Sequence, residues 1–109
     1  MASSAYRALA DPTRREILRL LREGDLAAGE LAGEFDISWP SVSRHLRVLE
    51  TAGLVSSARH GGHIIYSLQT SVLQDVATEV AAMAGVGKRT SRRASSSRTP
   101  RRQPRAERA

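Results

Sequence analysis

Serine, histidine and acidic residues all occur in the chain, so catalytic chemistry is the first possibility to consider. Their spacing forms no nucleophile motif, no phosphate-binding loop and no complete set of metal ligands. His60 and His63 have a spacing that could suggest zinc, but two histidines do not make a four-ligand site. The absence of cysteine excludes disulfides and thiolate metal sites. We therefore expect no enzyme, no catalytic residue, no metal site and no cofactor.

Two arginines and three serines in the segment SWPSVSRHLRVLETA offer a different chemistry, the recognition of nucleic acid. Apolar residues of this segment recur at helical spacing and predict a face turned to a core: Val42, Leu46 and Leu49. The polar residues between them are expected to face outward or to lie on the flanks: Ser41, Ser43, Arg44 and Arg47. Arginine can bridge the acceptors of guanine in the major groove, and serine can bond to bases or phosphates. The helix is thus a candidate for reading DNA.

The elements that must position this helix follow from capping signals and hydrophobic period. Helices are expected over residues 4–10, 12–23, 28–35 and 39–52. Asp11 before Pro12 is an N-cap followed by a first-turn proline, and Ser38 is the expected cap of the DNA-reading helix. Gly53 ends that helix. The third and fourth helices make a helix-turn-helix.

Behind Gly53 the hydrophobic period changes from helical to alternating. Residues 54–59 and 64–68 flank a glycine turn and predict a two-stranded hairpin. Thr70 or Ser71 then caps a last helix, whose apolar residues form a stripe: Val72, Leu73, Val76, Val80 and Met83. The order of elements predicts a mainly α fold with a β-hairpin wing, the winged helix-turn-helix.

Charge is distributed unevenly along the chain. Residues 88–109 hold nine cations and one acid, a net charge of +8, whereas residues 1–87 hold eight arginines and ten acids, a net charge of −2. Residues 88–109 are mainly Ser, Arg, Thr, Pro and Ala, a composition that cannot bury enough apolar surface to fold alone. We expect a DNA-binding and dimerisation domain at 1–87 and a disordered basic tail at 88–109. The tail is expected to anchor DNA without reading sequence, while a phosphorylation switch and a solubilising role remain alternatives.

Membrane and export signals are missing from the printed sequence. No apolar run is long enough to span a bilayer, and the N-terminus lacks the pattern of a signal peptide. We expect no membrane partner and a cytoplasmic, nucleoid-associated location.

Three segments together resemble a known family: LADPTRREILRLL, then DLAAGELAGEFDISWPSVSRHLRVLETAGLV, then ARHGGHIIYSL. They are similar to the ArsR family of winged-helix repressors, in particular to its metal-independent, SdpR-like branch. The resemblance covers residues 5–75, and the run SWPSVSRHLRVLETAGLV is highly specific to the family. It implies a homodimer joined through its first and last helices. Each subunit would present residues 38–49 to one half of an inverted-repeat operator in double-stranded DNA.

The resemblance also implies roles for individual residues. Base or groove contacts fall on Trp39, Pro40, Ser41, Ser43 and Arg44. Contacts to the DNA backbone fall on Ser38, Arg47, Arg59, His60 and His63. The dimer interface falls on Tyr6, Leu9, Leu73, Val76, Val80 and Met83.

Two departures from the family pattern concern metals. Metal-sensing members carry a pair of cysteines near the start of the third helix, where this chain reads DLAAGEL. A second family site uses Asp and His residues along the last helix, which here offers Asp75 and Glu79 and no histidine. We expect no response to metal through these sites. The family commonly has a polar residue where this chain has Trp39, and both DNA contact and internal packing remain open for that side chain.

The expected function is a homodimeric transcriptional repressor, and several alternatives remain beside it. An architectural DNA-binding protein would keep the winged helix and coat DNA with its basic tail. A ligand-responsive regulator would add a small-molecule effector of unknown identity. The apolar stripe of the last helix has a second interpretation as core of the single chain, and His45, beside the core-facing residues, is expected to be structural.

Overall fold

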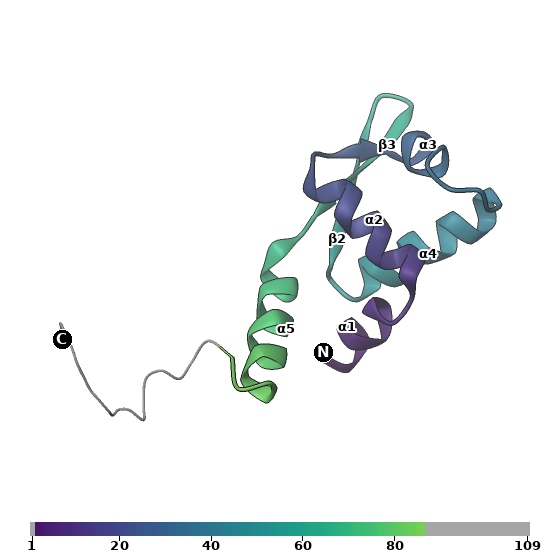
Figure 1. Ribbon diagram of the computed structural model, residues 1–109. Helices are drawn as coiled ribbons and strands as arrows, with labels where there is room; N and C mark the ends of the chain where they lie inside the picture. Colours follow the sequence, from purple (N-terminus) through teal and green to yellow (C-terminus); the bar gives the residue numbers. More distant parts are fainter. Residues whose placement is uncertain (1, 87–109) are drawn as a thin grey trace. The chain divides into compact units, whose positions relative to one another are not determined.

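The computed structural model describes residues 2–86 (Figure 1). Its helices are α1 Ala2–Leu9, α2 Pro12–Arg22, α3 Ala28–Ala32, α4 Trp39–Thr51 and α5 Thr70–Met83, and its strands are β1 Leu26–Ala27, β2 Val55–His60 and β3 His63–Leu68. Residues 1–76 form one compact unit, and a second unit begins at Ala77, within α5. The predicted basic tail, residues 88–109, lies outside the described residues.

Local capping places the helices where the sequence predicts them. The Asp11 carboxylate accepts a hydrogen bond from the Arg14 backbone N–H at 3.0 Å, and Ser38 Oγ accepts one from the Ser41 N–H at 3.3 Å. These caps satisfy donors that the first turn of a helix leaves unpaired. The helices predicted at 4–10, 12–23 and 39–52 are confirmed with boundaries that shift by at most two residues.

The helix predicted over residues 28–35 is wrong at its C-terminal end. The helix α3 stops at Ala32, and the following backbone tightens, because the N–H groups of Glu34 and Phe35 bond to carbonyls three residues earlier. Gly33, a weak helix former, stands at this point. Phe35 still packs against the core, so its spacing from Leu31 reflects a turn and not a continuous helix.

The sheet has three strands where the sequence predicts two. The hairpin is confirmed, with β2 and β3 paired from Val55↔Leu68 to His60↔His63 around a turn in which Gly61 has φ +61°. The additional strand β1 pairs with β3 on its other edge, giving the order β1-β3-β2. A strand of two residues is too short to show an alternating pattern, which explains why it was not predicted.

The core of residues 1–76 lies between α2, α3, α4 and the base of the sheet. Its largest fully buried side chains are Ile17, Leu31, Val42, Leu46, Leu49 and Leu54. Burial of each contributes about 1.5–3 kcal/mol relative to exposure. The small residues Ala5 and Ala8, both fully buried, allow α1 to approach its neighbours closely. This core fixes one face of α4 and leaves the opposite face to solvent.

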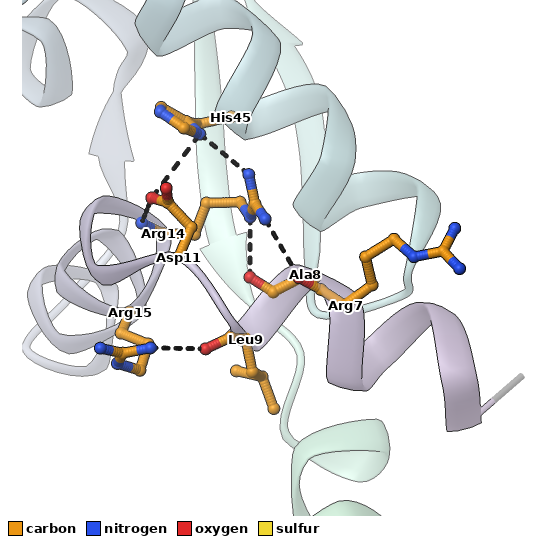
Figure 2. Close-up of polar contacts among 7 residues, drawn as sticks. All are labelled: Arg7, Ala8, Leu9, Asp11, Arg14, Arg15 and His45. Carbon is orange, nitrogen blue, oxygen red and sulfur yellow. Dashed lines mark hydrogen bonds and ion pairs between the residues drawn. The ribbon is translucent and has the colours of Figure 1, made fainter.

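Polar contacts tie α1 to the helices that follow it (Figure 2). Arg15 Nη1 donates to the Leu9 carbonyl at 2.8 Å, and Arg14 donates to two carbonyls at the end of α1. Arg14 also reaches His45, whose side chain is 19% exposed, which agrees with the structural role expected for this histidine.

Candidate nucleic-acid interface

The helix α4 has one buried and one exposed face. Val42, Leu46 and Leu49 are at most 1% exposed, so the predicted core face is confirmed. The residues predicted for DNA contact on this helix divide into two groups. Ser38, Trp39, Pro40, Arg44 and Arg47 are exposed, whereas Ser41 and Ser43 are half-buried on the flanks. The structure therefore leaves five of the predicted contact residues open to solvent and places the two serines at the edges of the buried face.

The N-terminus of α4 is organised by its two serines. Ser38 Oγ accepts the Ser41 backbone N–H and donates to Ser41 Oγ at 3.1 Å. The positive end of the helix dipole lies at the same point and favours an approaching anion such as a phosphate. Both hydroxyls thus stabilise the first turn of α4.

Trp39 is not a core residue, because it is 49% exposed. It lines a surface hollow of about 300 Å³. The other residues of this hollow come from β1, the start of α3 and the wing: Ala27, Ala28, Gly29, Gly62, His63 and Ile64. Of these, only His63 stands among the predicted site residues. The sequence does not predict that the start of α3 and Ile64 lie beside Trp39, because no periodic pattern links such distant segments.

The wing carries the remaining predicted DNA contacts. Arg59, His60 and His63 are all exposed at the end of the β2–β3 hairpin, on either side of the glycine turn. Within residues 2–86, no group of three or more His, Asp or Glu side chains is placed to hold a metal ion.

The arginines of α4 and the wing form no ion pair with an acidic side chain within residues 2–86. They are Arg44, Arg47 and Arg59. Glu50, the one acid of α4, accepts a hydrogen bond from Ser57 Oγ at 2.8 Å. Burial and the nearby Glu50 carboxylate raise the pKa of Tyr66, and Arg47 opposes them. The carboxylate of Glu50 is thus bonded to a serine of β2, whereas the three arginines are exposed to solvent.

The residues predicted for a dimer interface do not share one environment. Tyr6 and Leu9 are half-buried, Leu73 packs against the core, and Val76 is only 7% exposed. Val80 and Met83, in contrast, are 44% and 71% exposed. The apolar stripe of α5 therefore belongs partly to the core of the single chain and partly to its surface.

No helix within the described part of the chain has the length and apolar character that a membrane crossing requires.

Comparisons with known proteins agree on one family. The model for the bacterial regulatory proteins of the arsR family matches residues 11–57. The chain is 51% identical over 73 residues to the transcriptional repressor SdpR of Bacillus subtilis (strain 168), covering 67% of this chain and 81% of SdpR. It is 45% identical over 76 residues to the HTH-type transcriptional regulator Rv2034 of Mycobacterium tuberculosis, covering 70% and 71% of the two chains.

The fold comparison agrees with the sequence comparison. The crystal structure of an ArsR family transcriptional regulator matches with a TM-score of 0.70 at 30% identity, covering 75% of this chain and 84% of that one. These relatives are transcriptional regulators and not enzymes. The chain belongs to the ArsR family of bacterial regulatory proteins, and it is a DNA-binding transcriptional repressor with a winged helix-turn-helix fold.

Proposed function

We propose that the protein is a homodimer that binds an inverted-repeat operator and represses transcription by occupying it. The observation that carries this proposal is the exposed face of α4, where Arg44 and Arg47 are unpaired within the described residues while the opposite face is buried. The folded part as a whole is slightly acidic, so this local positive surface is the part of it suited to a phosphate-rich ligand.

Within this proposal, individual residues have distinct roles. Arg44 contacts base edges, supported by Ser41 and Ser43 on the flanks of α4, and Trp39 with Pro40 contacts the groove at the helix tip. Arg47, Ser38 and the wing residues contact the DNA backbone and fix the register of the helix without reading sequence: Arg59, His60 and His63. Because Trp39 is exposed and apolar, it can stack or contact a thymine methyl group.

The homodimer is proposed because a single helix-turn-helix reads only half of a palindrome. The exposed apolar residues of α5, Val80 and Met83, support a second copy of the chain as the group that covers them. Tyr6 and Leu9 of α1 complete the proposed interface. Leu73 and Val76 also belong to the proposed interface, and in the single chain they are partly or fully buried.

We also propose that residues 1–87 form the DNA-binding and dimerisation domain and that residues 88–109 anchor DNA through charge alone. The proposal includes no response to metal through the known family sites, since the chain has no cysteine and its last helix has no histidine. Zinc, cadmium or nickel at one equivalent should therefore leave operator affinity unchanged.

Selection from a pool of random duplexes tests the proposed function. A homodimeric repressor enriches an inverted repeat, and the chain–duplex complex has a stoichiometry of two chains per duplex. The rival, an architectural protein that coats DNA through its basic tail, enriches little or nothing. Enrichment of a single unrepeated site would contradict the dimer but keep sequence-specific binding.

A further inference from the structure

The side chain of Arg14, in the first turn of α2, joins α1 to α4 (Figure 2). Its Nε donates to the Ala8 carbonyl at 2.7 Å, and its Nη2 donates to the Arg7 carbonyl at 3.0 Å. Its Nη1 donates to Nδ1 of His45, in the middle of α4, at 3.1 Å. One guanidinium group therefore holds the end of α1 and the side chain of an α4 residue at the same time.

The chemistry of the guanidinium suits this position. Its donors form a rigid planar fork, so contacts made by different nitrogens are fixed relative to one another. The carbonyls of Arg7 and Ala8 belong to the last turn of α1, where backbone acceptors lack partners within the helix and a positive charge is favourable. An arginine can only donate, so Nδ1 of His45 is the acceptor in this contact.

The backbone of Arg14 is fixed as well. Its N–H donates to the carboxylate of Asp11, the N-cap of α2, and Asp11 Oδ2 also lies 3.9 Å from Nδ1 of His45. Burial raises the pKa of Asp11, but the hydrogen bonds from the backbone N–H groups of Arg14 and Thr13 and the charge of Arg14 outweigh this effect and hold that pKa below its usual value. The start of α2, the end of α1 and the centre of α4 thus meet in one polar cluster.

The contact has a consequence for the direction of α4. Beside His45, the core-facing side of this helix is held by Val42, Leu46 and Leu49, whose apolar contacts are non-directional. A hydrogen bond, in contrast, weakens steeply when its angle changes. His45 directly follows Arg44, so the bond to Arg14 restricts rotation of α4 and with it the direction in which Arg44 points.

We propose that Arg14 is a positioning residue, which sets the direction and separation of the two reading helices by coupling α1 to α4. The inference rests on the proposed function, in which α1 belongs to the dimer interface and α4 reads the operator. Half-sites of such dimers lie one helical turn apart, about 34 Å. A change in the orientation of α4 relative to α1 should therefore change the half-site spacing to which the dimer binds best.

Arg15 provides a matched control from the neighbouring position. It also donates from α2 to the last turn of α1, to the Leu9 carbonyl, but forms no polar contact with α4 within the described residues. Arg14→Lys and Arg15→Lys each keep the charge and remove one guanidinium fork. Only the first breaks the connection to His45.

The experiment measures binding of the full chain to a series of duplexes by fluorescence anisotropy. The series holds the selected inverted repeat, the same half-sites moved closer or farther by one and two base pairs, and a single half-site. For Arg14→Lys, we expect the preference for the selected spacing to fall on the order of tenfold, the factor that one charge-assisted hydrogen bond represents, and the affinity for the single half-site to fall by a smaller factor. Arg15→Lys should keep the preference of the unchanged protein.

A second pair of variants covers the case in which Arg14→Lys fails to fold. His45→Asn retains an acceptor at the position of Nδ1 and should keep the spacing preference, whereas His45→Leu removes the acceptor and should lose it, with circular dichroism reporting the fold. The inference is overturned if Arg14→Lys and His45→Leu keep the preference, or if Arg15→Lys loses it equally. If the unchanged protein itself shows no spacing preference, the proposed homodimer on an inverted repeat is contradicted. The positioning role of Arg14, which depends on that dimer, is then contradicted as well.

Discussion

At the scale of single residues, Trp39 is the largest uncharged side chain of the proposed interface. It is the only tryptophan of the chain and stands about half exposed at the start of α4. Fluorescence excited at a wavelength beyond the absorption of the two tyrosines therefore reports on this side chain alone. Its surroundings are apolar on the side of the hollow that it lines and solvent on the other. DNA in the proposed position would cover the solvent side.

We predict that operator DNA protects Trp39 from a neutral quencher such as acrylamide. The free protein should show ready quenching, because the indole is accessible, and the complex should show a clear reduction. A random duplex of equal length should protect less, because the helix tip is not seated in the groove. Equal quenching with and without operator would place Trp39 outside the contact and leave groove recognition to the other residues of α4.

Asp11 allows a prediction about stability and pH. Its pKa in the folded protein lies below the usual value of 3.8. The carboxylate therefore adds stability that is present above that value and is lost as the pH falls through the folded-state pKa. Asp11→Ala should cost about 0.5–2 kcal/mol near neutral pH, the range for a lost N-cap, and less than that near pH 2.5, where the carboxylate is increasingly protonated.

Urea unfolding at the two pH values measures this difference. Asp25→Ala removes an exposed acid that forms no hydrogen bond or ion pair within the described residues, and it should change the stability by less than ~0.5 kcal/mol at either pH. A cost for Asp11→Ala that is the same at both pH values would show that the charge of the cap does not contribute.

At the scale of elements, the end of α4 is set by a glycine with two constraints. Gly53 has φ +80°, a conformation that other residues rarely adopt, and a Cβ there would stand 3.3 Å from Cγ2 of Val72 on α5. Gly53→Ala is therefore predicted to destabilise the fold by about 1–2 kcal/mol from backbone strain alone. Gly62→Ala, in the wing turn with open space around it, serves as the control and should cost less. Equal midpoints of thermal unfolding for the two variants would contradict this account.

The helix α5 carries the prediction about assembly. Val80→Glu places a charge on its exposed apolar surface, so it should weaken self-association while the single chain stays folded. Thr78→Glu, also exposed on α5 but outside the apolar stripe, should leave the dimer intact. Sedimentation velocity over a concentration series distinguishes the two. An unchanged dimer in Val80→Glu would place the interface elsewhere.

Elements that depend on local signals could be predicted from the sequence. The caps at Asp11 and Ser38, the core face of α4 and the hairpin around Gly61 were correct because each signal lies within a few neighbouring residues. The strand β1 and the early end of α3 were not, since a two-residue strand has no period and its formation depends on pairing with β3. Propensity gives only a weak preference where tertiary contacts decide.

Contacts between residues that are far apart in the sequence could not be predicted from hydrophobic periodicity or capping signals. Arg14 and His45 stand 31 positions apart, and no spacing rule relates them. In the same way, the stripe of α5 reads as continuous in sequence, yet Val76 is buried and Val80 exposed. The pattern correctly showed which residues are apolar, but only packing determines which of them the single chain buries.

At the scale of the whole molecule, the charge is divided between two segments with different proposed tasks. Residues 88–109 carry a net charge of +8, whereas residues 1–87 carry −2 and hold the exposed face of α4. Charge without defined contacts strengthens binding to any DNA and makes it sensitive to salt. Contacts from α4 to base edges would strengthen binding to one sequence only.

The central claim, that α4 reads the operator, is tested most directly by the ratio of operator to random-DNA affinity over a salt series. Arg44→Ala should cost about 1–3 kcal/mol on the operator and far less on random DNA, so the ratio falls. A chain ending at Gly87 should weaken both affinities by similar factors and flatten the salt dependence, so the ratio survives. If removal of residues 88–109 abolished the ratio while Arg44→Ala kept it, α4 would not be the reader.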